Sequence, residues 1–270
     1  MPTTYSGNSS NVGSKGSGVV VPLFRGSPMD DEKKRANEWV DARGKRVEIA
    51  RFTHSYQPII CTSSENVYGY EIFSSAIDLE GNRVSPDHLL RGITDDLYLC
   101  ELDQRMMHSA SQVRVPDAIA QKRFVNISSE INFIALDPEV FADPSHTVIE
   151  LTEHFPILNW MALRERTEQL SEYGIEIAID DFGAGHGNLQ MLLELSPNYV
   201  KMDKYFAHHL DNFHSFKKQM AFLRDMVESV QSYGAKVICE GIETEQCMDA
   251  VRELGADFAQ GYYISRPKDA

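Results

Sequence analysis

The sequence predicts an α/β fold, a modified (β/α)8 barrel of the TIM type with an antiparallel first strand. Eight apolar runs of strand length occur in order, segments with helical spacing separate most of them, and each unit takes about thirty residues. Strands that alternate with helices in this way are typical of a parallel sheet covered by helices. The runs are residues 52–60, 67–73, 124–127, 147–151, 175–180, 199–202, 236–239 and 258–264.

Three of the intervening segments have clear helical spacing and are followed at once by glycine, the residue most often found just past a helix C-terminus. They are residues 157–173, 216–233 and 245–254.

The two ends of the barrel depart from a regular pattern. Only residues 61–66 separate the first two runs, too few for a crossover helix, so we expect these runs to pair antiparallel. After the last run the chain stops at Ala270 with no closing helix. Residues 30–42 have a helical charge pattern with Gly44 as a stop, and we expect this helix to fill the gap.

The chain therefore divides into three parts. Residues 1–29 form a Ser- and Gly-rich tail, which we expect to be flexible and which is a candidate for binding a protein partner. Residues 30–48 hold the short helix and a linker, and residues 49–270 form the barrel domain.

Composition excludes several classes of function. The formal net charge of −14 argues against broad contact with nucleic-acid backbones. No apolar run reaches the length of about eighteen residues that a membrane span needs, so we expect no membrane insertion. The N-terminus lacks the basic flank and apolar core of a signal peptide, so we expect a cytoplasmic location. The four cysteines are scattered, and we assign them no metal or disulfide role.

Polar residues stand at the C-terminal ends of most of the predicted strands, where barrel enzymes carry their reactive groups. One such residue carries little information, and Asp180-Asp181 alone is more typical of a loop with a helix N-cap. Because the pattern recurs along the chain, we expect these residues to meet at one mouth. They are Glu71, Asn126, Glu150, Asp180, Asp181, Lys201, Glu240 and Gln260.

The five carboxylates in this set need cations in order to lie close together. Oxygen ligands without His or Cys favour hard ions, Mg²⁺ or Mn²⁺. The carboxylates are more than one ion needs, so we predict a two-metal site, which typically activates a water and stabilises the leaving oxygen of a phosphate ester. Lys201 beside the ions would have its pKa lowered and take a proton from that water. A salt bridge from Lys201 to one carboxylate is the alternative.

From about Gln57 to Pro267 the sequence resembles the EAL domain family, phosphodiesterases that open cyclic di-GMP to linear pGpG. The resemblance rests on eight motifs in the order of the family. They are Tyr56-Gln57-Pro58-Ile59, Gly69-Tyr70-Glu71, Phe124-Val125-Asn126-Ile127-Ser128, Glu150-Leu151-Thr152-Glu153, Asp180-Asp181-Phe182-Gly183-Ala184-Gly185, Lys201-Met202-Asp203, Glu240-Gly241-Ile242-Glu243 and Gln260-Gly261-Tyr262.

The resemblance implies a role for each of these residues. The metal ligands would be Glu71, Asn126, Glu150, Asp180, Asp181 and Glu240, with Asp180 bridging the two ions. Lys201 would help to generate the attacking hydroxide, with Glu71 and Glu240 as its catalytic neighbours. Substrate-binding residues would be Gln57, Asp203, Glu243 and Gln260. Glu153 would hold the loop at residues 182–188, which in the family couples contacts of a homodimer to metal binding.

Two motifs depart from the family. The signature Glu-Ala-Leu-x-Arg reads Glu71-Ile72-Phe73-Ser74-Ser75, so Ser75 replaces an arginine that usually contacts a substrate phosphate. Such a loss threatens affinity more than chemistry. Residues 185–188 read Gly-His-Gly-Asn where the family usually has Gly-Tyr-Ser-Ser.

Three functions remain open on these residues. The first is an active, metal-dependent cyclic di-GMP phosphodiesterase, and the retained ligand set and Lys201 favour it. The second is a cyclic di-GMP receptor or protein-interaction module without turnover, which the altered signature favours. The third, a barrel with another metal-dependent chemistry such as enolisation, is disfavoured by the ordered motifs.

Overall fold

The computed structural model describes most of the chain after the N-terminal tail. The described residues are 38–40, 46–85, 96–116, 121–127, 130–152, 157–183, 188–210 and 216–270. The predicted tail at residues 1–29 lies outside this set, as do Glu153 and residues 184–187 of the loop after Phe182.

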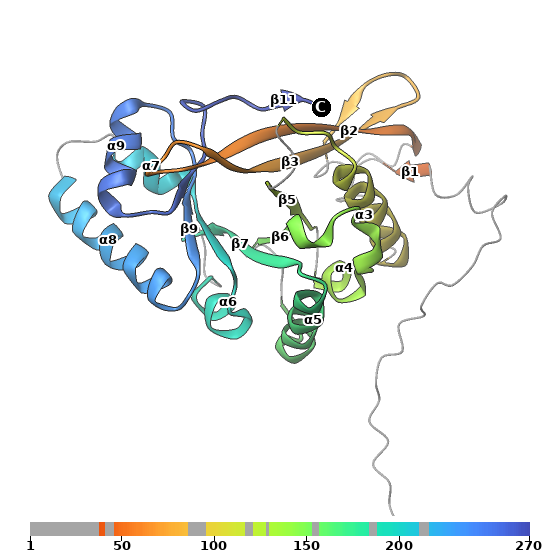
Figure 1. Ribbon diagram of the computed structural model, residues 1–270. Helices are drawn as coiled ribbons and strands as arrows, with labels where there is room; N and C mark the ends of the chain where they lie inside the picture. Colours follow the sequence, from red (N-terminus) through yellow and green to blue (C-terminus); the bar gives the residue numbers. More distant parts are fainter. Residues whose placement is uncertain are drawn as a thin grey trace, which may run out of the picture.

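Eight strands close into a barrel, as predicted (Figure 1). Around it, β2 neighbours β10, and the sheet continues through β9, β8, β7, β6, β5 and β3 back to β2. Strand β2 is antiparallel to both of its barrel neighbours, whereas the other neighbours pair parallel. The strands are β2 (Arg46–Cys61), β3 (Val67–Asp78), β5 (Lys122–Asn126), β6 (Thr147–Thr152), β7 (Glu176–Phe182), β8 (Tyr199–Met202), β9 (Lys236–Cys239) and β10 (Phe258–Ala259).

Helices surround the strands on the outside of the barrel (Figure 1). The three predicted helices are present as α5 (Trp160–Glu172), α8 (Phe216–Ser232) and α9 (Glu245–Leu254). The described residues contain four more helices, for which the sequence analysis set no bounds because two are only six and seven residues long and none is followed by a glycine stop. They are α3 (Asp96–Ser111), α4 (Glu130–Ala135), α6 (Asn188–Leu195) and α7 (Lys204–Leu210), and short 3-10 turns form η1 (Pro138–Val140) and η2 (Pro144–His146).

The predicted helix at residues 30–42 is wrong where the structure describes it. Glu38–Val40 form a strand, β1, that pairs antiparallel with β2, and β2 itself begins inside the predicted linker at Arg46. The other residues of the predicted helix lie outside the described residues. Near the C-terminus, β11 (Lys268–Asp269) pairs antiparallel with β2 at Ser55 and Tyr56, and β10 pairs with β2 at Ile60 and Cys61. Strands from the C-terminal part of the chain therefore cover this edge of β2. The short strand β4 (Arg83–Val84) pairs antiparallel with the C-terminal end of β3.

The eighth predicted strand is shorter than its apolar run. Only Phe258–Ala259 pair in the barrel, and the chain then turns at Gly261. A Cβ atom at Gly261 would lie 2.2 Å from the backbone N and O of Ile242. This close approach of two backbones is open only to glycine, and it takes residues 261–264 out of the sheet.

The barrel interior consists of an apolar layer beneath a polar one. One buried cluster gathers an inward-facing residue from each of seven strands: Ile59, Phe124, Val148, Ala178, Tyr199, Ile238 and Phe258. Side chains alternate between the two faces of a strand, so the residue two positions nearer the mouth also points inward. Those residues are Gln57, Asn126, Glu150, Asp180, Lys201, Glu240 and Gln260. The alternation therefore delivers the predicted site residues to one level of the barrel.

No helix in the part of the chain that the structure describes is both long and apolar enough to cross a bilayer.

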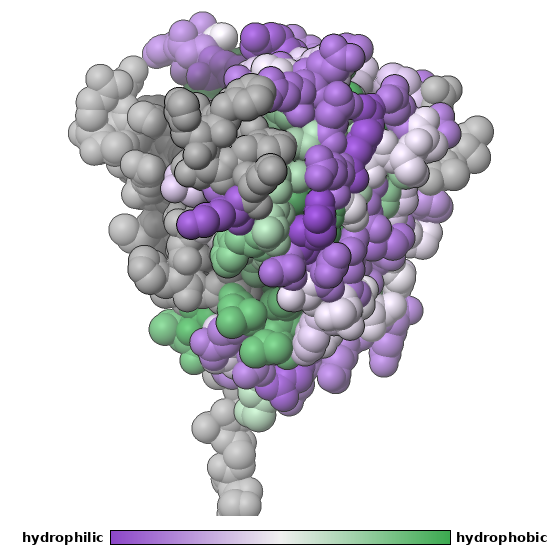
Figure 2. Space-filling model, turned by 90° about the vertical axis from the view of Figure 1, so that its left-hand side faces the viewer, coloured by the Kyte–Doolittle hydropathy of each residue, from purple (hydrophilic) through white to green (hydrophobic). Residues whose placement is uncertain are grey.

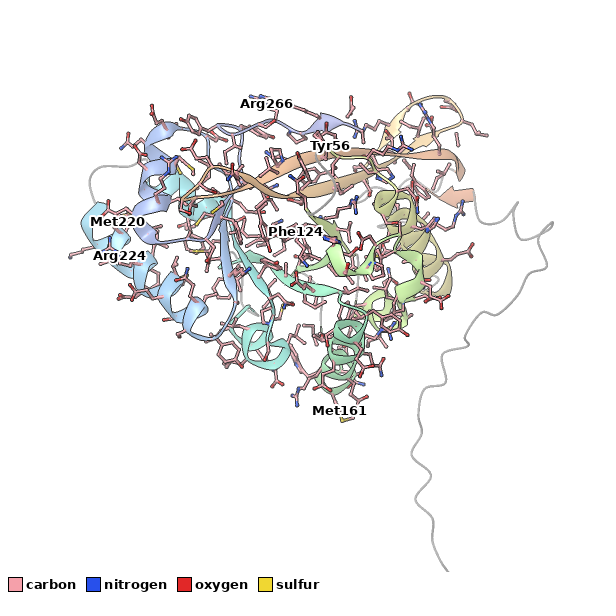
Figure 3. The ribbon with its side chains drawn as sticks, in the orientation of Figure 1. Tyr56, Phe124, Met161, Met220, Arg224 and Arg266 are labelled. Carbon is pink, nitrogen blue, oxygen red and sulfur yellow. The ribbon has the colours of Figure 1, made fainter. Side chains whose placement is uncertain are left out.

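The apolar layer is a test of this architecture. Phe124 is fully buried at the centre of the molecule (Figure 3), and its ring lies edge-on to Tyr199 with centroids 5.2 Å apart. We expect Phe124→Ala to lower the free energy of unfolding by about 3–5 kcal/mol, because it opens a cavity in the barrel. Phe222→Ala on α8, where the ring is 61% exposed, is the matched control and should cost about 0.5 kcal/mol. Equal losses in urea melts would contradict the assigned barrel interior.

Candidate metal centre

The centre is built around Lys201, a lysine that is 1% exposed at the end of β8. Its Nζ atom forms four ion pairs, with Glu150 Oε1 at 2.7 Å, Glu240 Oε1 at 2.8 Å, and Glu71 Oε2 and Asp180 Oδ1 each at 3.1 Å. We call Glu71, Glu150, Asp180 and Glu240 the carboxylate cluster. The strands β3, β6 and β7 and the residue after β9 supply it, so segments far apart in sequence converge as predicted.

Two amide side chains donate hydrogen bonds to Glu71, one to each of its carboxylate oxygens. Gln260 Nε2 donates to Glu71 Oε2 at 2.7 Å and to Gln57 Oε1 at 3.0 Å, and Asn126 Nδ2 donates to Glu71 Oε1 at 3.2 Å. Gln57 in turn donates to the carbonyl oxygen of Ser265 at 2.8 Å. Asn126 and Gln260 thus hold the glutamate of the signature motif directly, and Gln57 holds Gln260.

A bulge brings both aspartates of the Asp180-Asp181 pair to the centre. The register between β7 and β8 shifts between Ile179 and Phe182, and Asp181 has a φ of +54°. A bulge adds a residue to the strand, and Asp is one of the few side chains that tolerate this left-handed backbone. Carboxylate oxygens of Asp180, Asp181 and Glu240 then all lie within 4.8 Å of one another.

Close glycine contacts hold the segments that follow these strands. Gly183 has a φ of +94°, and a Cβ atom there would lie 2.3 Å from the ring of Phe206 in α7. A Cβ at Gly241 would lie equally near the Cβ of Lys204, at 2.3 Å. The start of α7 is therefore wedged between the chain that leaves β7 and the chain that leaves β9.

The electrostatics are dominated by burial. Burial, followed by the Glu71 carboxylate, raises the pKa of Glu150 well above its ordinary value even though Lys201 opposes the shift. Burial likewise raises the pKa of Glu240 to about 8.

Burial by itself would lower the pKa of Lys201, but the carboxylate cluster outweighs burial and holds that pKa well above its ordinary value. The carboxylates of the protein thus raise the pKa of Lys201, whereas the sequence analysis predicted that it is lowered. That predicted lowering requires bound cations. The alternative prediction, a salt bridge from Lys201 to one carboxylate, is exceeded, because Lys201 pairs with four of them.

The donor set fits a divalent cation. Glu150 Oε2 is buried without a hydrogen-bond partner, and so is the side-chain oxygen of Gln260. Buried oxygens of this kind are costly unless something compensates them. Asp180, Asp181 and Glu240 could hold one hard ion, with Glu71, Glu150 and Asn126 adjoining. Oxygen-only ligands are those that Mg²⁺ and Mn²⁺ prefer.

Three of the predicted residues are less closely integrated. Asp203 Oδ1 accepts the N–H of Tyr205 at 2.7 Å, so this side chain caps the start of α7. Glu243 is exposed on the segment after β9, and Glu153 lies outside the described residues. The sequence prediction also missed Glu130, which ties two of the connecting segments together and carries no motif that points to it.

A sequence profile of the EAL domain family matches residues 40–267. The cyclic di-GMP phosphodiesterase PdeB of Shewanella oneidensis is 32% identical over 139 residues, which cover 51% of this chain and 16% of that protein. The probable cyclic di-GMP phosphodiesterase PdeG of Escherichia coli is 26% identical over 226 residues, or 78% of this chain and 44% of that protein. The chain thus spans less than half the length of either relative.

Solved structures share the fold. The EAL enzyme Bd1971 in its cAMP- and cyclic-di-GMP-bound form has a TM-score of 0.67 and 23% identity, covering 81% of this chain and 62% of that one. BlrP1 of Klebsiella pneumoniae, in a calcium and cyclic di-GMP complex, has a TM-score of 0.66 and 21% identity, covering 81% and 56%. A manganese complex of BlrP1 has a TM-score of 0.65 and 21% identity, with the same coverage.

Lys201 and divalent cations should compete for the carboxylate cluster. In ion-free protein we expect Lys201→Met to lower the free energy of unfolding by about 3 kcal/mol or more, because the cluster loses its buried cation. Mn²⁺ should then raise the Tm of this variant more than that of the wild type, since the ion compensates the unpaired carboxylates. Lys218→Met on the exposed face of α8 is the control. Equal Mn²⁺ shifts in thermal melts would contradict a centre at this cluster.

Proposed function

Since the chain belongs to the EAL domain family, we propose that it is a metal-dependent phosphodiesterase that hydrolyses cyclic di-GMP to linear pGpG. The observation that carries this proposal is the carboxylate cluster around Lys201 at one end of the barrel. Relatives named as cyclic di-GMP phosphodiesterases, and neighbours whose structures hold cyclic di-GMP with calcium or manganese, support it.

In this proposal the cluster holds two Mg²⁺ or Mn²⁺ ions. The ligands would be Glu71, Asn126, Glu150, Asp180, Asp181 and Glu240. When bound, such ions lower the pKa of a water and neutralise charge that develops on a leaving phosphate oxygen.

The chain's own residues would prepare the attack. With cations bound, the pKa of Lys201 would be lowered, so that its Nζ atom, among the cluster, could take the proton of the attacking water and hold the hydroxide in line with the phosphorus. Gln260 and Gln57 keep Glu71 in place through their hydrogen bonds. The water-poor interior strengthens each of these contacts, because the layer beneath is apolar.

Substrate recognition would fall to residues at the rim. Gln260, whose buried side-chain oxygen has no hydrogen-bond partner, would accept a hydrogen bond from a guanine or ribose group in this proposal. Asp203 and Glu243 lie on the segments that follow β8 and β9. Glu153, in the connection after β6, would hold the loop at residues 182–188.

The competing candidate is a receptor that binds cyclic di-GMP without turnover. Ser75 favours it: this residue is 9% exposed on β3, paired with Thr53 of β2, where the family usually has arginine. Serine cannot make the charge-assisted bond to a phosphate that arginine makes.

One assay separates the two candidates. Purified protein is incubated with cyclic di-GMP and Mg²⁺ or Mn²⁺, and nucleotides are resolved by chromatography. Accumulation of pGpG supports the phosphodiesterase. Retained binding in calorimetry without pGpG supports the receptor, and the absence of both contradicts either function.

Glu71→Ala and Lys201→Ala should each lower kcat by about 10³-fold, because each removes a group at the reacting phosphate. Glu228→Ala and Lys218→Ala, on exposed positions of α8, are the matched controls and should keep the wild-type rate. Circular dichroism at saturating Mn²⁺ verifies the fold. An unaffected rate in either site variant would remove that residue from the proposed mechanism.

We also propose a homodimer that forms through α5 and α6. Leu158 and Met161 at the start of α5 are 86% and 67% exposed, and Leu189 and Leu193 of α6 are 65% and 57% exposed. The two helices lie side by side, joined by an ion pair between Arg164 and Glu194, and Met161 points away from the body of the molecule (Figure 3). Figure 2 shows a mostly hydrophilic side on which hydrophobic surface gathers low, at the level of α6 in Figure 1.

The double variant Leu189→Asp/Leu193→Asp should therefore shift the protein from dimer to monomer in light scattering, because two charges would be buried in the contact. Phe222→Asp places a charge at an exposed apolar position on α8 and should leave the dimer intact. A wild-type protein that is monomeric at micromolar concentration, or a double variant that stays dimeric, would contradict this surface.

A further inference from the structure

Two predicted metal ligands, Asn126 and Glu150, lie at the ends of neighbouring strands that one backbone hydrogen bond joins just beyond their paired residues. Asn126 of β5 pairs with Glu150 of β6, and the N–H of Ile127 donates to the carbonyl oxygen of Glu150 at 3.3 Å. The next α-helices along the sequence are α4 after β5 and α5 after β6. Because this last bond is long, it constrains the strand ends only weakly.

Glu130, the first residue of α4, ties the same two chains a second time. Its Oε1 accepts the N–H of Asn159 at 2.7 Å, and its Oε2 accepts the N–H of Leu158 at 2.9 Å. The glutamate is only 8% exposed. One buried carboxylate thus accepts two backbone donors at the start of α5, where the helix dipole also favours negative charge.

The helix that carries Glu130 is itself fixed from behind. Asn132 is 1% exposed and donates to Asp103 Oδ2 at 2.7 Å, while Cys100 Sγ donates to Asn132 Oδ1 at 2.9 Å. Both partners lie on α3. Glu130 therefore projects from a base that cannot shift without breaking buried hydrogen bonds.

The backbone bond between Ile127 and Glu150 and the bonds from Leu158 and Asn159 to Glu130 together define a closed loop of contacts, called the ring below, that contains Asn126 and Glu150. Its described members are Asn126, Ile127, Glu130, residues 157–159 and residues 150–152, and the contacts that close it are the Glu130–Leu158 bond and the Asn126–Glu150 pairing. Glu150 Oε2 has no hydrogen-bond partner, so no neutral neighbour orients this carboxylate. Its Oε1 atom pairs with Lys201 Nζ at 2.7 Å, and the backbone of β6, to which the described contacts of Glu130 are linked along the chain, sets where the side chain begins.

We propose that Glu130 is a positioning residue that sets the separation of Asn126 and Glu150 and thereby the affinity of the centre for divalent cations. This role rests on the proposed metal site and adds a residue to it. Outer-shell groups that orient ligands typically change metal affinity about 10–100-fold when removed. Glu130 acts through backbone, so its effect falls on ion affinity and spares the chemistry at saturating ion.

The test is a titration of purified full-length protein with Mn²⁺, in which free Mn²⁺ is counted by electron paramagnetic resonance. In Glu130→Ala we expect the dissociation constant for Mn²⁺ to rise about 10-fold, with kcat at saturating Mn²⁺ within about twofold of wild type. Glu130→Gln keeps one acceptor oxygen and should give an intermediate shift. The control is Glu139→Gln, an exposed glutamate on the neighbouring turn η1.

Three outcomes would overturn the proposal. A lowered Tm with an unchanged dissociation constant would make Glu130 a purely stabilising residue. A loss of kcat that saturating Mn²⁺ does not restore would place it in the chemistry. A wild-type protein that binds no Mn²⁺ would remove the metal site as well. If Glu130→Ala does not fold, the Glu130→Gln titration decides. Because Mn²⁺ binding is counted directly, a wild type without turnover still tests Glu130, so failure of the proposed hydrolysis is distinguishable.

Discussion

The structure depends on four carboxylates, two buried and two partly buried, that surround a single buried ammonium group. A carboxylate taken out of water without a partner is costly, so four of them at one end of a barrel destabilise the fold unless a counter-charge compensates them. Lys201 supplies one positive charge at 2.7–3.1 Å from each member of the carboxylate cluster. The negative charge that Lys201 does not balance would attract the divalent cations of the proposed centre, so the fold and the proposed chemistry have the same electrostatic origin.

The rest of the molecule serves to keep this charge arrangement in place. The apolar layer of the barrel lies directly beneath the carboxylate cluster. The amide groups of Asn126 and Gln260 donate to Glu71, and Gln57 accepts a bond from Gln260. The connecting segments are locked to one another by contacts that only glycine allows, as at Gly183 beside Phe206. A centre on such a frame needs little rearrangement to accept its ions.

Much of this could be predicted from the sequence, because a strand's period of two is a strong constraint. Once the apolar runs are placed, the inward direction of Phe124 fixes that of Asn126, and the same holds for Tyr199 and Lys201. What failed depended on long-range packing. Charges at helical spacing near the N-terminus were overridden by the open edge of β2, which pairs with Glu38–Val40. Glu130 could not be found, since nothing local marks a glutamate whose partners lie 28 and 29 residues away.

The reversed direction of β2 has a practical consequence. The turn at residues 62–66, which joins β2 to β3, lies at the opposite end of the barrel from the carboxylate cluster, beside Asp257, whose carbonyl oxygen accepts the N–H of Thr62. In a barrel of parallel strands alone, these two strands would need a much longer connection, usually a crossover helix packed against its neighbours. Here it is a short surface hairpin, and such loop tips are where proteins accept inserted sequence most readily. An epitope or fluorescent reporter placed there would leave both the chain termini and the mouth of the barrel free.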